Sequence, residues 1–325
     1  MISRKRPFVI AHRGACGYLP EHTLAAKALA YGMRADFLEQ DLVATRDDQV
    51  IVSHDIHLDR VTDVARRFPE RVREDGRYYA RDLDLAEIRS LTVSERVNAD
   101  GSAVFPGRFP IETGNFRVHT FKEELLFVRG LNRATGREVG VYPEIKAPSW
   151  HHTEGVDLAT LTLEILDEFG YRSRDDKVFV QCFDWRETRR LRGELGTQLP
   201  LIQLIADPSW RESDTDYAYL QSDKGLREMS EVVDGIGPWI NQLVDVQAID
   251  GCPVSTGVVA RAHAAGLAVH PYTFRSDALP KGFGSFDELL AFFLEELGVA
   301  GIFTDFPDLA VQFVHQQFSG ESSKM

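Results

Sequence analysis

The chain of 325 residues is 43% hydrophobic and carries 50 acidic against 37 basic side chains, which gives a formal net charge of -13. A chain of this length can bury a large core, but its acidic balance gives no electrostatic support to a surface for nucleic acid or anionic lipid. No apolar run approaches the roughly 20 residues that span a bilayer. We therefore expect neither a nucleic-acid partner nor membrane insertion, and nothing in the sequence indicates the oligomeric state.

The N-terminal stretch MISRKRPFVIAHRG starts with basic residues and then enters an apolar strand directly. It has neither the long apolar segment nor the small-residue cleavage site of a secretory signal peptide. As written, the chain is expected in the cytoplasm. A periplasmic location would follow if a signal had been trimmed from the sequence.

Short runs rich in β-branched or aromatic residues follow along the chain, and amphipathic segments separate them. The eight runs are residues 8–12, 37–43, 139–146, 177–183, 201–206, 234–239, 267–273 and 301–307. Intervening segments such as HTLAAKALAYG and TGVVARAHAAG stop at a glycine, a common helix C-cap. Eight strand-helix units predict an α/β fold in which a parallel sheet closes into a (β/α)₈ TIM barrel.

Residues 56–116 interrupt this alternation after the second strand, because they lack strong periodicity. A structureless loop of that length is uncommon inside a compact domain. We expect a single domain over residues 1–325, with residues 56–116 inserted and folded onto the rim of the barrel; we call this segment the rim insertion. Two interpretations stay open: it shapes the substrate entrance, or its charged residues form a solvated surface.

Polar residues recur at the predicted ends of the strands, where a (β/α)₈ barrel gathers its catalytic groups. They are His12, Arg13, Glu39, Asp41, His54, Asp55, Glu144, Lys146, Gln181, His270, Tyr272 and Asp305. Their number and position predict one polar site at the mouth of the barrel.

Three of these residues form a candidate metal site. Glu39 and Asp41 lie two apart in an extended segment, so their side chains project to one face, roughly 6–7 Å apart. Buried carboxylates repel each other, and a divalent cation would remove this penalty. Glu144, on the next barrel strand, is a natural third ligand. The alternative, salt-bridged surface acids, fits poorly with the apolar stretch FLEQDLV. An all-oxygen set suits Mg²⁺ or Ca²⁺ better than zinc.

His12 and His54 are the candidates for acid/base chemistry, since imidazole changes charge near neutral pH. A lone histidine is usually structural, but each of these stands at a strand end beside Arg13 or Asp55. Arg13 and Lys146 add fixed positive charge. A metal, two histidines and two cations fit a phosphate ester better than a carbonyl compound or a sugar, so the sequence predicts phosphoryl chemistry.

The motifs AHRGACGYLPEHT, EQDLVATRDDQVIVSHD and YPEIKAP closely resemble those of glycerophosphodiester phosphodiesterases. VQCFD, VHPYTFRSD and GIFTDFPD stand where that family has its later barrel motifs, so the resemblance covers nearly the whole chain. It is closest to the bacterial subgroup that is typically periplasmic. His22 stands where many relatives have Asn, and we interpret it as a variation at the start of a helix.

The resemblance implies a metal-dependent hydrolysis of glycerophosphodiesters to sn-glycerol 3-phosphate and an alcohol. It also implies a role for each site residue. Glu39, Asp41 and Glu144 correspond to metal ligands, with Ca²⁺ expected before Mg²⁺, His12 and His54 to the acid/base pair, Arg13 and Lys146 to phosphate contacts, and Gln181, Phe183 and Tyr272 to the lining of the glycerol end.

Two other enzyme classes stay open at this point. A barrel glycosidase could use Glu39 and Glu144 as its carboxylate pair, although this leaves His12, Arg13 and His54 unexplained. A lipid phosphodiesterase of the sphingomyelinase D type would share the barrel, but the sequence shows no exposed apolar stretch for membrane binding. The alcohol that is released cannot be inferred from the sequence.

Overall fold

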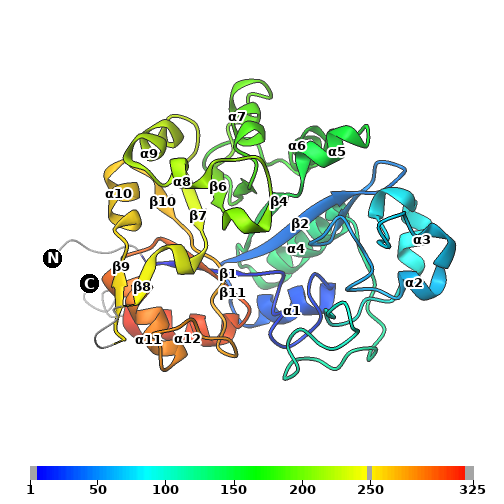
Figure 1. Ribbon diagram of the computed structural model, residues 1–325, viewed down its shortest axis with the longest axis horizontal. Helices are drawn as coiled ribbons and strands as arrows, with labels where there is room; N and C mark the ends of the chain where they lie inside the picture. Colours follow the sequence, from blue (N-terminus) through cyan, green and yellow to red (C-terminus); the bar gives the residue numbers. More distant parts are fainter. Residues whose placement is uncertain (1–5, 247–250, 319–325) are drawn as a thin grey trace.

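The computed structural model describes residues 6–246 and 251–318. Within them, eight parallel strands form a nearly closed barrel with helices on its outside, as predicted (Figure 1). The barrel strands are β1 (Phe8–Ala11), β2 (Phe37–Ala44), β4 (Gly140–Ile145), β5 (Val180–Cys182), β6 (Leu201–Ile205), β7 (Gly235–Pro238), β10 (Ala268–Val269) and β11 (Gly301–Thr304). Their order in the sheet is β10-β7-β6-β5-β4-β2-β1-β11. The ends approach each other where the Ala300 amide donates to the Val269 carbonyl at 3.0 Å.

The helices between the strands begin at polar caps that the sequence supplies. Thr23 caps α1 and Asp184 caps α7, whereas Thr120 and Glu123 form a reciprocal capping box at the start of α4. The helices outside the rim insertion are α1 (Leu24–Gly32), α4 (Phe121–Thr135), α5 (Pro148–Thr153), α6 (Leu158–Glu168), α7 (Trp185–Gly193), α8 (Tyr217–Leu220), α9 (Asp223–Ser230), α10 (Val258–Ala264), α11 (Phe286–Ala291) and α12 (Pro307–Phe318), with short turns η3 (Pro208–Trp210), η4 (Ile240–Gln242) and η5 (Phe292–Glu296). No helix among the described residues is long and apolar enough to cross a membrane.

The inward positions of the barrel change from aromatic to acidic along each of two central strands. Phe37 precedes Glu39 by two residues on β2, and Tyr142 precedes Glu144 by two on β4, so each pair shares one face of its strand. Phe37 and Tyr142 pack edge to face with ring centroids 6.0 Å apart, in a separate cluster with Ile10, Ile202 and Phe303. This apolar plug lies on the N-terminal side of the carboxylates and fixes the strands that carry them.

The rim insertion folds against a hairpin that extends β2. Strand β3 (Val50–Val52) pairs antiparallel with the end of β2. The insertion itself contains only α2 (Val64–Arg67), α3 (Leu85–Ser90) and the turns η1 (Pro69–Arg71) and η2 (Ala80–Asp82). Its buried Leu58, Ile88 and Leu91 pack with Val43 and Ile51 of the hairpin into a second hydrophobic core. In Figure 1 this part lies to one side of the barrel, opposite the small hairpin β8 (Val244–Val246) and β9 (Pro253–Ser255), which the sequence did not predict.

Candidate functional site

Strand β1 ends in a sharp turn, which directs the side chains of His12 and Arg13 towards the site. The His12 amide still donates to Thr304 on β11 at 3.0 Å, but Arg13 has a φ of 56° and Gly14 a φ of 90°. A Cβ at Gly14 would lie 2.8 Å from the carbonyl carbon of Ala26 on α1. Only glycine therefore fits this turn.

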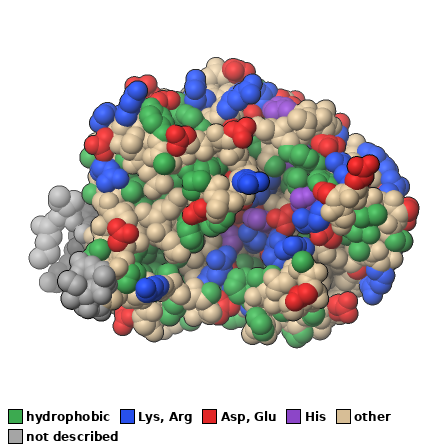
Figure 2. All heavy atoms as spheres, viewed as in Figure 1, with side chains coloured by type: hydrophobic (Ala, Val, Ile, Leu, Met, Phe, Trp, Pro, Cys, Tyr) green, Lys and Arg blue, Asp and Glu red, His purple; other side chains and the backbone are tan. Residues whose placement is uncertain are grey.

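A cavity of about 390 Å³ opens at the carboxyl ends of the strands. Figure 2 shows a hollow on this face, in which basic and histidine side chains gather. The residues given a metal, acid/base, phosphate or glycerol role all line the cavity except Lys146, whose Nζ contacts Glu144. Of the other predicted strand-end residues, Asp55, His270 and Asp305 do not line it. The lining residues are His12, Arg13, Glu39, Asp41, His54, Glu144, Gln181, Phe183, Leu204, Trp210, Glu212, Trp239, Tyr272, Thr273, Arg275 and Phe303.

The three predicted carboxylates lie together and are all buried. Asp41 on β2 pairs in register with Glu144 on β4. Burial, followed by the Asp41 charge, raises the pKa of Glu39 well above its usual range. Burial also raises the pKa of Glu144, against the influence of Lys146. Burial opposes ionisation of Asp41 too, but His54 and Lys146 nevertheless hold its pKa well below the usual value. Burial without a cation therefore disfavours the charges of Glu39 and Glu144, whereas the charge of Asp41 is stabilised by its neighbours.

A divalent cation fits this cluster. The Oδ1 atom of Asp41 is buried and has no hydrogen-bond partner among the described residues. An unpaired anionic oxygen in a buried site is costly unless a cation compensates it. One ligand atom each of Glu39, Asp41 and His22 lies within 4.8 Å of the others. These residues, with Glu144 beside Asp41, are the ones that could hold an ion.

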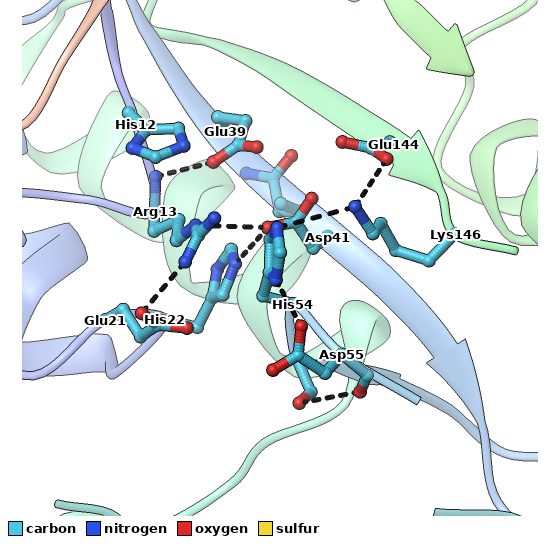
Figure 3. Close-up of polar contacts among 12 residues, drawn as sticks. His12, Arg13, Glu21, His22, Glu39, Asp41, His54, Asp55, Glu144 and Lys146 are labelled. Carbon is cyan, nitrogen blue, oxygen red and sulfur yellow. Dashed lines mark hydrogen bonds and ion pairs between the residues drawn. The ribbon is translucent and has the colours of Figure 1, made fainter. Parts of the chain in front are cut away.

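His22 contributes more to the site than its interpretation as a helix-start variation implied. It precedes the cap of α1 with a φ of 56°, and its Nε2 lies 2.7 Å from Asp41 Oδ2 (Figure 3). Burial lowers its pKa to about 3, so the ring is neutral. A neutral ring must donate through Nε2 to the carboxylate, because a carboxylate only accepts. The sequence offered no signal for this contact, since residues 22 and 41 are joined only by the fold.

His12 is paired with a carboxylate at the end of β11. Its Nδ1 lies 2.6 Å from Asp305 Oδ1, and both side chains are buried. Burial, with Arg13 as the second cause, lowers the pKa of His12 to about 4. Although burial also disfavours the Asp305 charge, Arg275, His12 and Arg108 hold the pKa of Asp305 well below its usual range. An ionised Asp305 fixes the proton on Nδ1 and leaves Nε2 as a free acceptor.

His54 repeats this arrangement on the other side of the carboxylates (Figure 3). Its Nδ1 lies 2.6 Å from Asp55 Oδ1, and its Nε2 is 3.5 Å from the Nζ of Lys146. Burial, then Arg13 and Lys146, lowers the pKa of His54. The Lys146 ammonium can only donate, so Nε2 is the acceptor and Nδ1 carries the proton. Lys146 also contacts Glu144 at 2.8 Å.

Arg13 is held by acidic groups rather than left free. Its Nη1 donates to Glu21 at 2.9 Å, its Nε lies 3.5 Å from Asp41, and its backbone amide donates to Glu39 at 2.5 Å. Burial disfavours its charge, but Glu21, Asp41 and Glu39 raise the pKa of Arg13 further above its already high value. It is therefore a fixed cation at the edge of the carboxylate cluster.

The remaining wall of the cavity is largely aromatic. Phe183 and Tyr272 pack edge to face at 5.8 Å, and the Tyr272 hydroxyl donates to the Ile205 carbonyl at 2.9 Å. Gln181 is buried, with its Oε1 unpartnered among the described residues. Trp210 and Trp239 extend this wall with ring centroids 4.9 Å apart. The two tryptophans were not predicted as site residues: Trp210 lies in the short turn η3, and Trp239 directly follows β7.

His270, in contrast, does not reach the cavity. Its Nδ1 and the Tyr142 hydroxyl share a hydrogen bond of 2.8 Å, and its ring packs edge to face on Phe8 and Phe179. It belongs to the interior of the barrel: β10 ends at Val269, and the first side chain of this segment to line the cavity is that of Tyr272, two residues further along the chain.

Comparison with known proteins places this barrel and its site in a class of phosphodiester hydrolases. The model of the glycerophosphoryl diester phosphodiesterase family matches residues 12–309. A glycerophosphodiester phosphodiesterase from Haemophilus influenzae is 43% identical and aligns over 94% of this chain and 89% of its own length. One from Treponema pallidum is 37% identical over 94% of this chain and 91% of its own length. The chain belongs to the glycerophosphoryl diester phosphodiesterase family and is an enzyme.

Solved structures show the same fold. A protein from Silicibacter pomeroyi, described as a glycerophosphoryl diester phosphodiesterase, superposes with a TM-score of 0.70 at 23% identity, covering 96% of this chain and 95% of its own. An Oleispira antarctica phosphodiesterase, solved in complex with the product sn-glycerol-3-phosphate, superposes with a TM-score of 0.63 at 19% identity, covering 95% and 96%. Both agree with the predicted TIM barrel.

Proposed function

We propose that this enzyme hydrolyses glycerophosphodiesters to sn-glycerol 3-phosphate and an alcohol, with His12 and His54 as the proton-transfer groups. The observation that carries this proposal is the convergence of two His–Asp pairs on one cavity that also contains three buried carboxylates. The product bound by the Oleispira antarctica relative supports the choice of sn-glycerol 3-phosphate. Family membership favours this reaction over the glycosidase alternative.

We further propose that Glu39, Asp41 and Glu144 bind a divalent cation, Ca²⁺ before Mg²⁺. The support is the number of buried carboxylates and the orphaned Asp41 oxygen. The oxygen-only set of these three acids suits hard cations. When bound, such an ion would neutralise the acids and offset the charge of the phosphodiester.

The arrangement of the two histidines supports proton transfer during hydrolysis. Hydrolysis adds water to phosphorus and breaks the bond from phosphorus to the alcohol oxygen. One imidazole accepts a proton from the attacking group, and the other, once protonated, gives a proton to the departing alcohol. Both rings have Nδ1 engaged by an aspartate, which leaves each Nε2 to exchange that proton. Arg13 and Lys146 would contact the phosphate.

The aromatic side of the cavity would bind the glycerol end. Phe183 and Tyr272 offer apolar faces to the carbon chain, and the unpartnered Gln181 oxygen can accept from a glycerol hydroxyl.

A coupled assay for glycerol 3-phosphate tests the proposal. Purified enzyme is dialysed against EDTA and then assayed with several glycerophosphodiesters, with sphingomyelin and with a glycoside, before and after addition of Ca²⁺ or Mg²⁺. We expect release of glycerol 3-phosphate only from the glycerophosphodiesters and only with added cation. Full turnover in excess EDTA would contradict the metal site, and turnover of sphingomyelin alone, measured as choline release, would support the lipid alternative.

A further inference from the structure

The rim insertion reaches the aspartates that lie behind both histidines. Arg96 Nη1 donates to Asp55 Oδ2 at 2.6 Å, and Arg108 Nη2 donates to Asp305 Oδ2 at 2.7 Å. In each case the histidine contacts the other oxygen, Oδ1, of the same aspartate at 2.6 Å. Two chains of contacts, each His–Asp–Arg, therefore end in one inserted segment that the strand-end pattern left outside the site.

On the His54 side, Arg96 bridges two carboxylates. Its Nε and Nη2 donate to Glu21 at 3.0 and 2.6 Å, while its Nη1 donates to Asp55. Glu21 in turn accepts from Arg13 at 2.9 Å. The Arg96 side chain is only 17% exposed. A planar guanidinium with its three nitrogens bound in this way fixes the plane of the Asp55 carboxylate.

On the His12 side, Arg108 is held still more closely. Its side chain is 4% exposed and lies over the Phe105 ring at 3.7 Å. It donates to both oxygens of Asp277, at 2.8 and 3.1 Å, as well as to Asp305. Arg275 donates to the same Asp305 oxygen at 2.7 Å. Asp305 thus has one oxygen bound to the histidine and the other bound to two arginines.

The second hydrophobic core fastens the segment that carries these arginines. Val93, just before Arg96, is buried in that core and pairs with Thr62 and Phe116 in isolated bridges. Among the described residues that line the cavity, the arginines are Arg13 and Arg275. Arg96 and Arg108 therefore act on the site through the aspartates rather than by touching a bound substrate.

We propose that Arg96 and Arg108 are positioning residues that orient the two acid/base histidines through Asp55 and Asp305, so that the rim insertion is part of the working site. This inference rests on the proposed roles of His12 and His54. An aspartate bound on one oxygen only can rotate, and its histidine can then tilt or exchange its tautomer. Binding of the second oxygen removes that freedom, as the partners behind a metal-bound histidine do.

The test compares single variants in the full-length enzyme with its cation bound. Arg96→Gln and Arg108→Gln should each lower kcat about 10–100-fold, the range typical of residues that orient a working group, with a much smaller change in KM. Arg96→Lys and Arg108→Lys should recover part of the loss, because lysine restores the charge but not the planar fork. The lysine variants also test the inference if a glutamine variant fails to fold. Arg73→Gln is the matched control, since Arg73 lies in the same insertion and binds Asp82 and Glu154, away from both histidines.

A second readout separates positioning from a structural role. The ¹⁵N shifts of the ring nitrogens report the tautomer of each histidine. Arg96→Gln should loosen the Nδ1–H tautomer of His54 and leave His12 unchanged. Arg108→Gln should affect His12 and leave His54 unchanged, with a smaller effect because Arg275 still donates to Asp305 Oδ2. Folded variants with kcat and tautomers equal to those of the wild type, beside inactive His12→Ala and His54→Ala, would overturn the inference alone. Activity retained by those alanine variants would instead overturn the proposed function.

Discussion

Asp41 and Glu144 lie directly opposite each other in the register of β2 and β4, yet their surroundings differ. Asp41 Oδ2 is 2.7 Å from His22 and 3.5 Å from Arg13. Glu144 has the Lys146 ammonium at 2.8 Å. Because Asp41 lies among several donors, its pKa lies well below the usual range, whereas burial raises the pKa values of Glu39 and Glu144. The donors around Asp41 therefore stabilise its negative charge in the folded protein.

Asp41→Asn should lower the stability of the metal-free enzyme by about 1.5–3 kcal/mol, the range for a hydrogen bond to a charged group. If repulsion among the acids were the only effect, Asp41→Asn would raise the stability. In this variant, however, His22 and Arg13 also lose their anionic partner. Glu39→Gln should change the metal-free stability much less, because burial disfavours the Glu39 charge and glutamine can still accept from the Arg13 amide. Thermal or urea unfolding in EDTA measures both. A metal-free Asp41→Asn protein more stable than the wild type would show that repulsion dominates.

With Ca²⁺ present, the two variants should behave alike. Each removes one proposed ligand, so each should lose most of the stabilisation that saturating cation gives to the wild type. The shift in unfolding midpoint on addition of Ca²⁺ measures this directly. A full shift in either variant would remove that residue from the ligand set.

His12→Ala and His54→Ala should each lower kcat by about 10²–10⁴-fold, the usual contribution of general acid/base groups. Because both would act in one proton-transfer cycle, the double variant should lose much less than the product of the two single losses. Steady-state kinetics with a glycerophosphodiester, together with circular dichroism to confirm folding, provides the measurement. Strictly multiplicative losses would mean that the two rings act independently.

Local sequence pattern accounts for much of this molecule. The period-two placement of Glu39 and Asp41 on an apolar strand correctly predicted their shared face. Contacts between distant segments could not be predicted this way. Arg96 meets Asp55 across 41 residues and Arg108 meets Asp305 across 197, and both arginines come from a segment without periodicity. Such pairings depend on how an irregular segment packs against the barrel, and the hydrophobic pattern of the sequence does not predict this packing.

His270 should make the folded protein less stable at acidic pH, and His270→Asn should remove this pH dependence. Burial lowers the pKa of His270 to about 4, from 6.5 in the unfolded chain. Between these values the unfolded chain binds a proton that the folded one does not. The free energy of unfolding therefore decreases as the pH falls from 6.5 towards 4, and above pH 6.5 His270 no longer makes it depend on pH. The free-energy difference between wild type and His270→Asn should therefore move against the wild type by at most about 1.4 kcal/mol per pH unit.

Urea unfolding of both proteins at about pH 7, 6 and 5 gives this difference. The comparison cancels the buried carboxylates, whose raised pKa values act in the opposite direction. A difference that does not vary with pH would mean that His270 binds its proton equally in the folded and unfolded chains.

Gly14→Ala should damage both stability and catalysis, and Gly155→Ala is its matched control. Both glycines have a positive φ, 90° and 78°, so alanine is strained at either, by about 1–3 kcal/mol. At Gly155 an added Cβ meets nothing within 4 Å, whereas at Gly14 it meets the carbonyl carbon of Ala26 at 2.8 Å. Overpacking against backbone adds about 1–3 kcal/mol, so Gly14→Ala should be the less stable of the two.

The clash at Gly14 should also lower the catalytic rate. The turn around Gly14 is docked on α1, where the Ala15 amide donates to the Ala26 carbonyl at 3.0 Å. Relief of the clash must push the turn away from the helix and carry His12 and Arg13 with it. A shift of about 1 Å at a reacting group can cost about 10²-fold in rate, so kcat should fall by that order in Gly14→Ala and stay near the wild-type value in Gly155→Ala. Equal kcat in the two folded variants would show that the position of His12 does not depend on this turn.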